Sequence, residues 1–139
     1  MVLDIYSRQV VGWSMSGRLT RELTIDALNQ AVSRRTLSPG VIFHSDRGGR
    51  FACKEFQNLL AKRGMIPSMS RTGDCNDNAI AETFFDTLKT ELIYFEKYRS
   101  RNKARRSIFE YIEVFYNRQR RHSALGYMTP AEFEETSLN

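Results

Sequence analysis

Two carboxylates in this chain stand where they could bind a divalent metal ion. Asp46 follows the apolar run 41–45 and precedes a pair of glycines, which predicts the end of a strand at a tight turn. Glu82 follows with 35 residues between the two, in the early turns of a helix predicted to begin after the Asn- and Asp-rich stretch 76–78. Carboxylate oxygens suit a hard cation such as Mg²⁺. Each residue alone also has an ordinary explanation, since Asp is common in turns and Glu is favourable near a helix N-terminus.

A lysine lies on the same predicted helix face as Glu82. Lys89 follows it by two helical turns, or about 10.5 Å along the helix axis. A cation in this position could contact a phosphate group beside the carboxylates. The alternative is an ordinary surface lysine.

The elements that would position these side chains alternate between strands and helices. The apolar run 41–45 predicts a strand that is covered on both faces. We expect a hairpin at 1–15, a second short strand at 65–70, and helices at about 20–35, 52–63, 77–91, 103–120 and 131–136. This order fits one α/β domain.

Apolar spacing predicts which side chains form the core. The helix at 103–120 has apolar residues at i, i+3, i+4, i+7 and i+8, which is typical of one inward face. The residues expected in the core are Trp13, Leu23, Ala27, Leu28, Ala31, Val32, Phe56, Leu59, Leu60, Phe84, Phe85, Ile108, Tyr111, Ile112, Phe115 and Tyr116.

Composition indicates an ordinary globular chain whose positive charge favours a polyanionic partner, with solubility alone as the alternative explanation of mild basicity. The 139 residues carry a formal net charge of +5 and are 41% hydrophobic. Two cysteines are too few for a disulfide scaffold or a four-ligand zinc site. The sequence shows no signal peptide and no apolar run long enough to span a membrane, so we expect a cytoplasmic protein.

Several motifs, taken in order, resemble the DDE transposases, which share a catalytic core with retroviral-type integrases. The resemblance is to insertion sequences whose transposase is made by joining two reading frames. The matching stretches are 4–13, His44-Ser45-Asp46-Arg47-Gly48-Gly49, 68–71, 77–89, 116–118 and 121–133. The resemblance implies a ribonuclease-H-like α/β fold. The integrase core would cover 1–139, with a C-terminal helical extension from about 103.

The resemblance also implies roles for individual residues. Asp46 and Glu82 would be catalytic metal ligands for Mg²⁺ or Mn²⁺, and Lys89 would contact a phosphate near them. In the complete family domain two ions support phosphoryl transfer, in which water and then a 3′-hydroxyl attack DNA. The DNA partners would be transposon ends and target, and the chain would be associated with the nucleoid in a bacterial cytoplasm. The residues expected to bind DNA are Arg47, Arg71, Asn78, Lys89, Arg105 and Arg106.

The family's first catalytic Asp has no counterpart among the matching stretches. By the resemblance it lies on a central strand that precedes the segment beginning at Met1, and Asp4 matches the second strand. We therefore expect a catalytic core without its first strand, which is inactive alone and either forms oligomers or assembles with full-length transposase. One alternative is a non-catalytic remnant that binds DNA or inhibits a transposase. Another is a nuclease of related fold that recruits Asp4 or Asp77.

Overall fold

The computed structural model describes residues 1–71 and 79–137. They form two compact units, one of Met1–Val2 and Gly12–Thr83 and the other of Leu3–Val11 and Phe84–Asn139. The strands are β1 (Val2–Leu3), β2 (Val10–Gly12), β3 (Ile42–Ser45) and β4 (Ile66–Met69). The helices and helical turns are α1 (Arg21–Arg34), α2 (Gly49–Ala52), α3 (Lys54–Lys62), α4 (Ala79–Glu91), η2 (Ile93–Phe95), α5 (Arg101–Glu110), η3 (Tyr111–Tyr116), η4 (Ser123–Leu125) and α6 (Pro130–Ser137).

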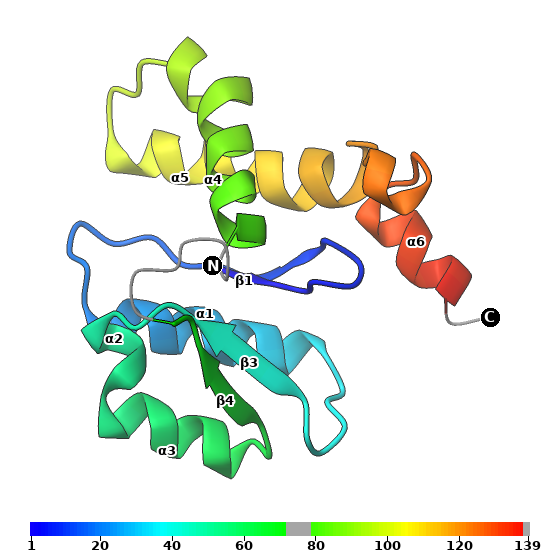
Figure 1. The fold of residues 1–139 in the computed structure, drawn as a ribbon. Helices are drawn as coiled ribbons and strands as arrows, with labels where there is room; N and C mark the ends of the chain where they lie inside the picture. The colour runs from blue at the N-terminus through cyan, green and yellow to red at the C-terminus, as the bar shows by residue number, and fades with distance from the viewer. Residues whose placement is uncertain (72–78, 138–139) are drawn as a thin grey trace. The chain divides into compact units, whose positions relative to one another are not determined.

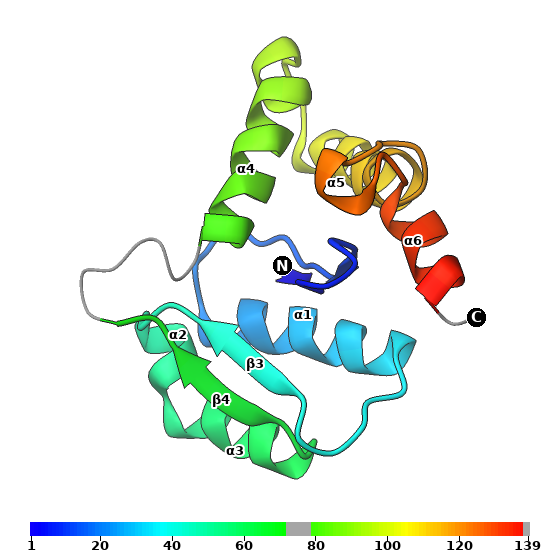
Figure 2. The same cartoon turned by 45° about the vertical axis from the view of Figure 1, so that its right-hand side comes forward.

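The first unit is built on the parallel pair β3 and β4, which lie side by side in Figures 1 and 2. Ile42 pairs with Ile66 at the start of the ladder and Ser45 with Met69 at its end. The crossover between these parallel strands contains α2 and α3, as a parallel connection requires. The predicted strands at 41–45 and 65–70 and the predicted helices at 20–35 and 52–63 are therefore confirmed.

Only one face of this strand pair is covered by the core of the first unit. Leu28 of α1 packs with Phe56 and Leu60 of α3, and Phe43 of β3 packs against this cluster. Alternate strand residues point to opposite faces, and Ile42 is accordingly 66% exposed. The prediction that this strand is covered on both faces is wrong for the described residues. Its continuous apolar sequence gave no sign of which face would be open.

A glycine lets strand and helix approach closely in the same unit. A side-chain carbon at Gly12 would overlap the carbonyl oxygen of Ala27 and crowd Ala31 on α1. Only glycine lacks this atom, so it permits the contact. Trp13, expected in the core, is only partly buried, and its backbone N–H donates to Gln30 Oε1 at 2.7 Å.

The strands β1 and β2 pair with each other, so the predicted hairpin is present. The second unit contains its loop, most of α4 and the helices that follow. Its long helix begins as α5 with Ser100 as N-cap, whose hydroxyl accepts from the Lys103 N–H at 3.2 Å. It continues as the π-helical segment η3. A π-helix has i→i+5 hydrogen bonds and therefore a wider turn than an α-helix. Tyr111, Ile112 and Tyr116 are buried as predicted.

Two aromatic residues expected in the core of the second unit are largely exposed. Phe115 is 39% exposed because the wider π-helical turn rotates its side chain away from the face predicted from a regular α-helix. Phe85 is 44% exposed, whereas its neighbour Phe84 is buried edge-on against Tyr116. Consecutive helical residues point in directions about 100° apart, so α4 turns only one of the pair inward.

Polar side chains join distant segments of the second unit. Asn117 donates to the Val10 carbonyl at 3.0 Å and accepts from the Val10 N–H at 2.9 Å. Ser7 donates to Glu134 Oε1 at 2.6 Å. Asp4 Oδ1 accepts from the N–H of Tyr6, which gives this carboxylate a role within the hairpin loop.

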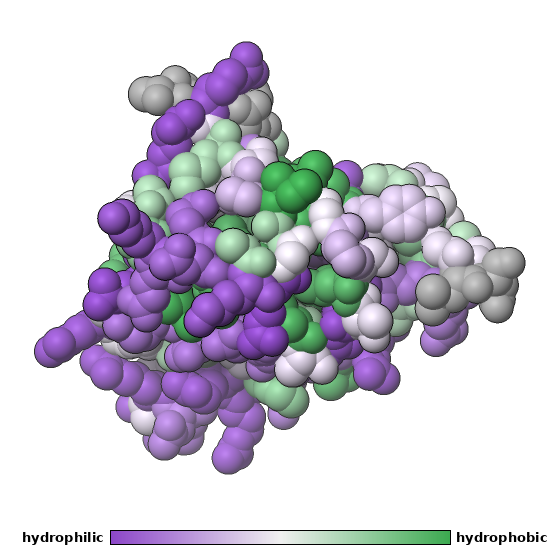
Figure 3. Space-filling view, turned by 90° about the horizontal axis from the view of Figure 1, so that it is seen from below, coloured by the Kyte–Doolittle hydropathy of each residue, from purple (hydrophilic) through white to green (hydrophobic). Residues whose placement is uncertain are grey.

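The structure is thus a mixed arrangement of helices and small sheets, as the α/β prediction requires. On the face seen in Figure 3, hydrophobic residues reach the surface among a majority of hydrophilic ones. Among the described residues, no helix is long and apolar enough to cross a membrane. The absence of a first, central strand stays a prediction.

Candidate functional site

Asp46 lies exposed immediately after β3, as its position in the sequence predicts. Its Oδ1 accepts from the Gly48 N–H at 2.7 Å, which closes a tight turn. A side-chain carbon at Gly48 would lie 2.8 Å from that oxygen, so the turn favours glycine. Among the described residues, no group donates to the second oxygen, Oδ2. The carboxylate therefore has one oxygen that fixes its orientation and one that can bind a ligand.

Ser70, the buried residue after β4, holds the residues on both sides of Asp46. Its N–H donates to the Ser45 carbonyl at 2.8 Å. Its own carbonyl accepts from Arg47 Nε at 2.8 Å. The end of β3 is consequently fixed to the neighbouring strand at positions 45 and 47. Arg47 is thereby oriented, and no described residue accepts from its two terminal nitrogens.

His44 adds a second connection between the two strands. Its Nδ1 is hydrogen-bonded to Ser68 Oγ at 2.9 Å and its Nε2 to Ser70 Oγ at 3.2 Å. No role at the site was predicted for His44, Ser68 or Ser70 from the sequence. Period-two alternation, which places His44 and Asp46 on one strand face and Ser68 and Ser70 on one face of the next strand, is the signal that could have found them.

Glu82 and Lys89 both lie exposed on α4, which confirms the predicted helix. Positions i and i+7 share a helix face. Among the described residues, no group forms a hydrogen bond or ion pair with the Glu82 carboxylate. Asn78, the predicted cap and DNA contact, lies outside the described residues, as does Asp77. The geometry joining Glu82 to Asp46 remains a prediction.

The carboxylates of Asp46 and Glu82 are ligands of the kind that a divalent metal ion prefers. Asp46 and Glu82 offer exposed carboxylate oxygens, the ligands that Mg²⁺ and Mn²⁺ prefer. Within residues 1–71 and 79–137, no group of three or more His, Cys, Asp or Glu side chains is placed to hold a metal ion.

The remaining predicted DNA contacts are exposed arginines. Arg71 follows β4, and Arg105 and Arg106 lie near the middle of α5. Arg71 and Arg105 each also interact with other residues of the chain. Exposed guanidinium groups can bind phosphate.

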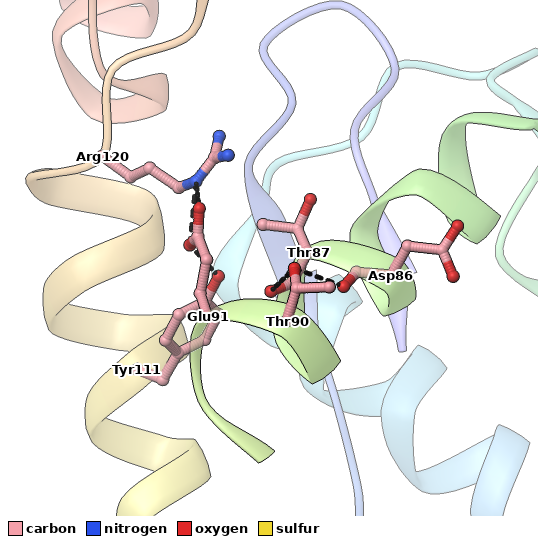
Figure 4. Close-up of polar contacts among 6 residues, drawn as sticks. All are labelled: Asp86, Thr87, Thr90, Glu91, Tyr111 and Arg120. Carbon is pink, nitrogen blue, oxygen red and sulfur yellow. Dashed lines mark hydrogen bonds and ion pairs between the residues drawn. The ribbon is translucent and has the colours of Figure 1, made fainter. Parts of the chain in front are cut away.

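A polar cluster in the second unit is structural in character. Figure 4 shows Glu91 of α4 between Tyr111 and Arg120. Tyr111 Oη donates to Glu91 Oε2 at 2.7 Å, and Arg120 Nε donates to Oε1 at 2.8 Å and to Oε2 at 3.0 Å. Burial, together with its hydrogen bond to Glu91, raises the pKa of Tyr111 far above its usual range. The cluster ties the end of α4 to the long helix. Sequence patterns did not predict this cluster, because Tyr111 and Arg120 lie 20 and 29 positions after Glu91.

His122 packs edge-on against Tyr116, with ring centroids 5.1 Å apart. Its buried Nε2 has no hydrogen-bond partner among the described residues. Burial, reinforced by Arg120 and Arg8, lowers the pKa of His122. Tyr116 is buried as predicted, and the neighbouring Asn117 supplies two side-chain hydrogen bonds to the backbone of Val10.

Comparison with known proteins agrees with the motif order. Residues 1–75 and 63–130 match the family described as Integrase core domain. The transposase InsF of insertion sequence IS3A from Escherichia coli is 46% identical over 138 residues, which cover 99% of this chain and 48% of that protein. The transposase of insertion sequence element IS904 from Lactococcus lactis is 42% identical, covering 96% of this chain and 53% of that protein.

The chain spans about half the length of these curated relatives. Its match nonetheless includes both predicted carboxylates and nearly all of the described helices and strands. The chain therefore belongs to the integrase core domain family and is related to the DDE transposases of IS3-type insertion sequences.

Proposed function

We propose that this chain forms part of the catalytic domain of a DNA transposase, which joins DNA by metal-dependent phosphoryl transfer. The observation that carries the proposal is Asp46, exposed at the C-terminal end of a parallel strand with one carboxylate oxygen engaged by the chain. Open α/β sheets place their sites at this edge. The family relationship supports the same chemistry.

Each proposed residue has a defined task at the DNA. Asp46 and Glu82 hold Mg²⁺ or Mn²⁺. When bound, such ions activate an attacking oxygen and stabilise the leaving oxygen on phosphorus. Lys89 holds a phosphate beside Glu82, and Arg47, oriented by the Ser70 carbonyl, binds another. Arg71, Asn78, Arg105 and Arg106 also contact the DNA.

We further propose that the isolated chain lacks activity because two carboxylates do not complete a two-ion site. A third ligand would come from a segment beyond those matched here, in the same polypeptide or in a full-length transposase that assembles with this chain. Residues from about 103 would form a helical extension of the core. The substrates would be transposon ends and target DNA in the bacterial nucleoid.

A second candidate function is DNA binding without catalysis, with or without inhibition of a complete transposase. The observation favouring it is the exposed basic sequence that opens α5, including Arg101, Lys103 and Arg106. Phosphate neutralisation by such residues gives affinity that falls steeply with salt and requires no carboxylate.

A chimeric transposase tests the catalytic proposal. The chain would replace the matching half of its IS3A relative, and strand transfer of end-containing DNA would be measured in Mg²⁺ and Mn²⁺. We expect Asp46→Asn and Glu82→Gln each to reduce strand transfer more than about 100-fold. Asp26→Asn, at an exposed carboxylate of α1, is the matched control and should have little effect.

Two outcomes would contradict these proposals separately. An active chimera that tolerates Asp46→Asn would remove the catalytic role of Asp46. Strand transfer by the isolated chain in Mn²⁺, lost on Asp46→Asn, would show that the site is complete without another ligand. Salt-sensitive DNA binding, unchanged by either carboxylate substitution and without strand transfer in the chimera, would favour the second candidate.

A further inference from the structure

Two adjacent aromatic residues protrude from the turn that follows α4. Tyr94 and Phe95 of η2 are 71% and 81% exposed. The preceding residues, Leu92 and Ile93, are partly buried. The Phe95 N–H donates to the Leu92 carbonyl at 3.1 Å, which makes η2 an ordered turn. Exposed large rings in succession are costly in water, so they indicate a surface that meets a partner.

The sequence around these rings is strongly basic. Lys97, Arg99, Arg101 and Lys103 are all exposed, and Glu96 is the only carboxylate between Tyr94 and Lys103. Tyr94, Phe95 and these four cations all lie exposed within residues 94–103, and we call the exposed part of this segment the aromatic–basic surface. Its charge is complementary to a polyanion.

Two hydrogen bonds order the segment that carries this surface. Tyr98 Oη is bonded to Ser107 Oγ at 2.9 Å, which ties the connecting segment to α5. Ser100 caps the N-terminus of α5. The rings and the cations therefore belong to one ordered part of the second unit, anchored at its other end by Glu91 in the cluster of Figure 4.

The neighbouring apolar groove suits a polyanion poorly. It is lined by Leu92, Glu96, Ser107, Glu110, Tyr111, Val114 and Phe115. Its two carboxylates would repel phosphate, whereas the aromatic–basic surface would attract it. The centres of protein interfaces are depleted in charged residues, so the four cations favour a nucleic acid over a second protein on this surface.

The exposed rings distinguish between forms of nucleic acid. Bases in a duplex stack on each other and leave no face for a side-chain ring, whereas unpaired bases stack on aromatic residues. We propose that the aromatic–basic surface binds single-stranded DNA, with bases stacked on Tyr94 and Phe95 and phosphates held by Lys97, Arg99, Arg101 and Lys103. This inference deepens the proposed function, because it assigns an unpaired DNA segment to a surface of the DNA-binding chain.

Fluorescence polarisation of the intact chain with a labelled single strand of about 16 nucleotides, and with its duplex, tests the proposal. We expect tighter binding to the single strand. Tyr94→Ala and Phe95→Ala should each weaken it about 10-fold and leave the salt dependence between about 50 and 200 mM unchanged. Phe95→Trp should preserve affinity and show emission quenched by stacked bases. Tyr127→Ala, at another highly exposed ring, is the control.

Substitution of the cations provides a second arm. Lys97→Ala and Arg99→Ala should each lower the slope of log affinity against log salt by about 0.7 for a single strand. Equal affinity for single strand and duplex, or aromatic variants that bind like the parent chain, would overturn the proposal. A dimer in sedimentation that dissociates in Tyr94→Ala, with unchanged single-strand affinity, would assign the rings to a second copy instead.

Failure here is distinguishable from failure of the proposed function. Asp46→Asn should retain single-strand binding whether or not it abolishes strand transfer in the chimera. Conversely, Tyr94→Ala should leave the Asp46 site intact. Circular dichroism of each variant would show that the chain keeps its helical content.

Discussion

The two compact units use their polar side chains over very different sequence distances. In the first unit, an apolar cluster around Phe56 forms the core, and the polar contacts join neighbouring strands 23 to 26 positions apart. In the second, Asn117 and Glu134 bind residues 107 and 127 positions away. The first unit therefore uses polar groups to shape a site, while the second uses them to join separate segments.

The largest effect should come from the apolar core of the first unit. Phe56 is completely buried between α1 and β3, so Phe56→Ala should lower the free energy of unfolding by about 3–5 kcal/mol. Guanidinium denaturation followed by circular dichroism would measure this. Ile42→Ala, at an exposed position of the same unit, should cost far less. A loss below about 1 kcal/mol at Phe56 would show that this cluster is not the core.

A polar substitution should affect mainly the second unit. Asn117→Ala removes both side-chain hydrogen bonds to Val10 and leaves the buried N–H and carbonyl of Val10 unpaired. The free energy of unfolding should fall by about 2–4 kcal/mol. Native-state hydrogen exchange would locate the loss, and exposed Asn102→Ala is the control. If α1 and α6 lost hydrogen-exchange protection equally, the two units would unfold together. That outcome would contradict a loss confined mainly to the second unit.

A smaller effect is expected at the end of α4. Glu91→Gln weakens the contacts to Tyr111 and Arg120 and should destabilise the second unit by about 1 kcal/mol, because the ion pair is partly exposed. A double-mutant cycle with Arg120→Gln would measure the coupling energy. Glu110→Gln, at an exposed position of α5, serves as control. Additive effects of the two substitutions would mean that Glu91 and Arg120 have no coupling energy and that their ion pair does not stabilise the unit.

The smallest effect is a pH dependence from His122. Its folded-state pKa is lowered by burial, with Arg120 and Arg8 adding to the shift and Glu91 opposing it. The unfolded chain therefore binds the proton more readily. The stabilisation is present above the unfolded pKa of about 6.5 and is lost as pH falls from there toward the lowered folded pKa. The slope cannot exceed about 1.4 kcal/mol per pH unit.

His122→Phe keeps an aromatic ring against Tyr116 and removes the titrating group. Urea denaturation between about pH 7 and 5 should then show a flatter stability profile than the parent chain. An unchanged profile would assign the acid sensitivity to other groups of the chain.

Local patterns predicted the elements well because each pattern is set by neighbouring residues. Periodicity placed α1, α3, α4 and α6, and the strand that ends at Asp46. It misplaced Phe115, because a π-helical segment changes the helix period without a sequence signal. It also overestimated the burial of Ile42, since an apolar run does not reveal which face stays open.

The candidate site was predictable in part for the same reason. A strand end, a glycine turn and a helix position mark Asp46 and Glu82 locally. The support from Ser70 and His44, and the link from Glu91 to Arg120, depend on which segments meet in space. Hydrogen bonds between segments leave no regular spacing, so only coordinates reveal them.

The link between Asn117 and Val10 has a consequence for synthesis of the chain. The hairpin leaves the ribosome before its partner Asn117, which is made 107 residues after Val10. At about 5–20 residues per second, the hairpin waits for roughly 5–20 s with its backbone groups unmatched. The first unit can meanwhile assemble from consecutive sequence. The order of translation thus favours completion of the unit that carries Asp46 before the unit that encloses the hairpin.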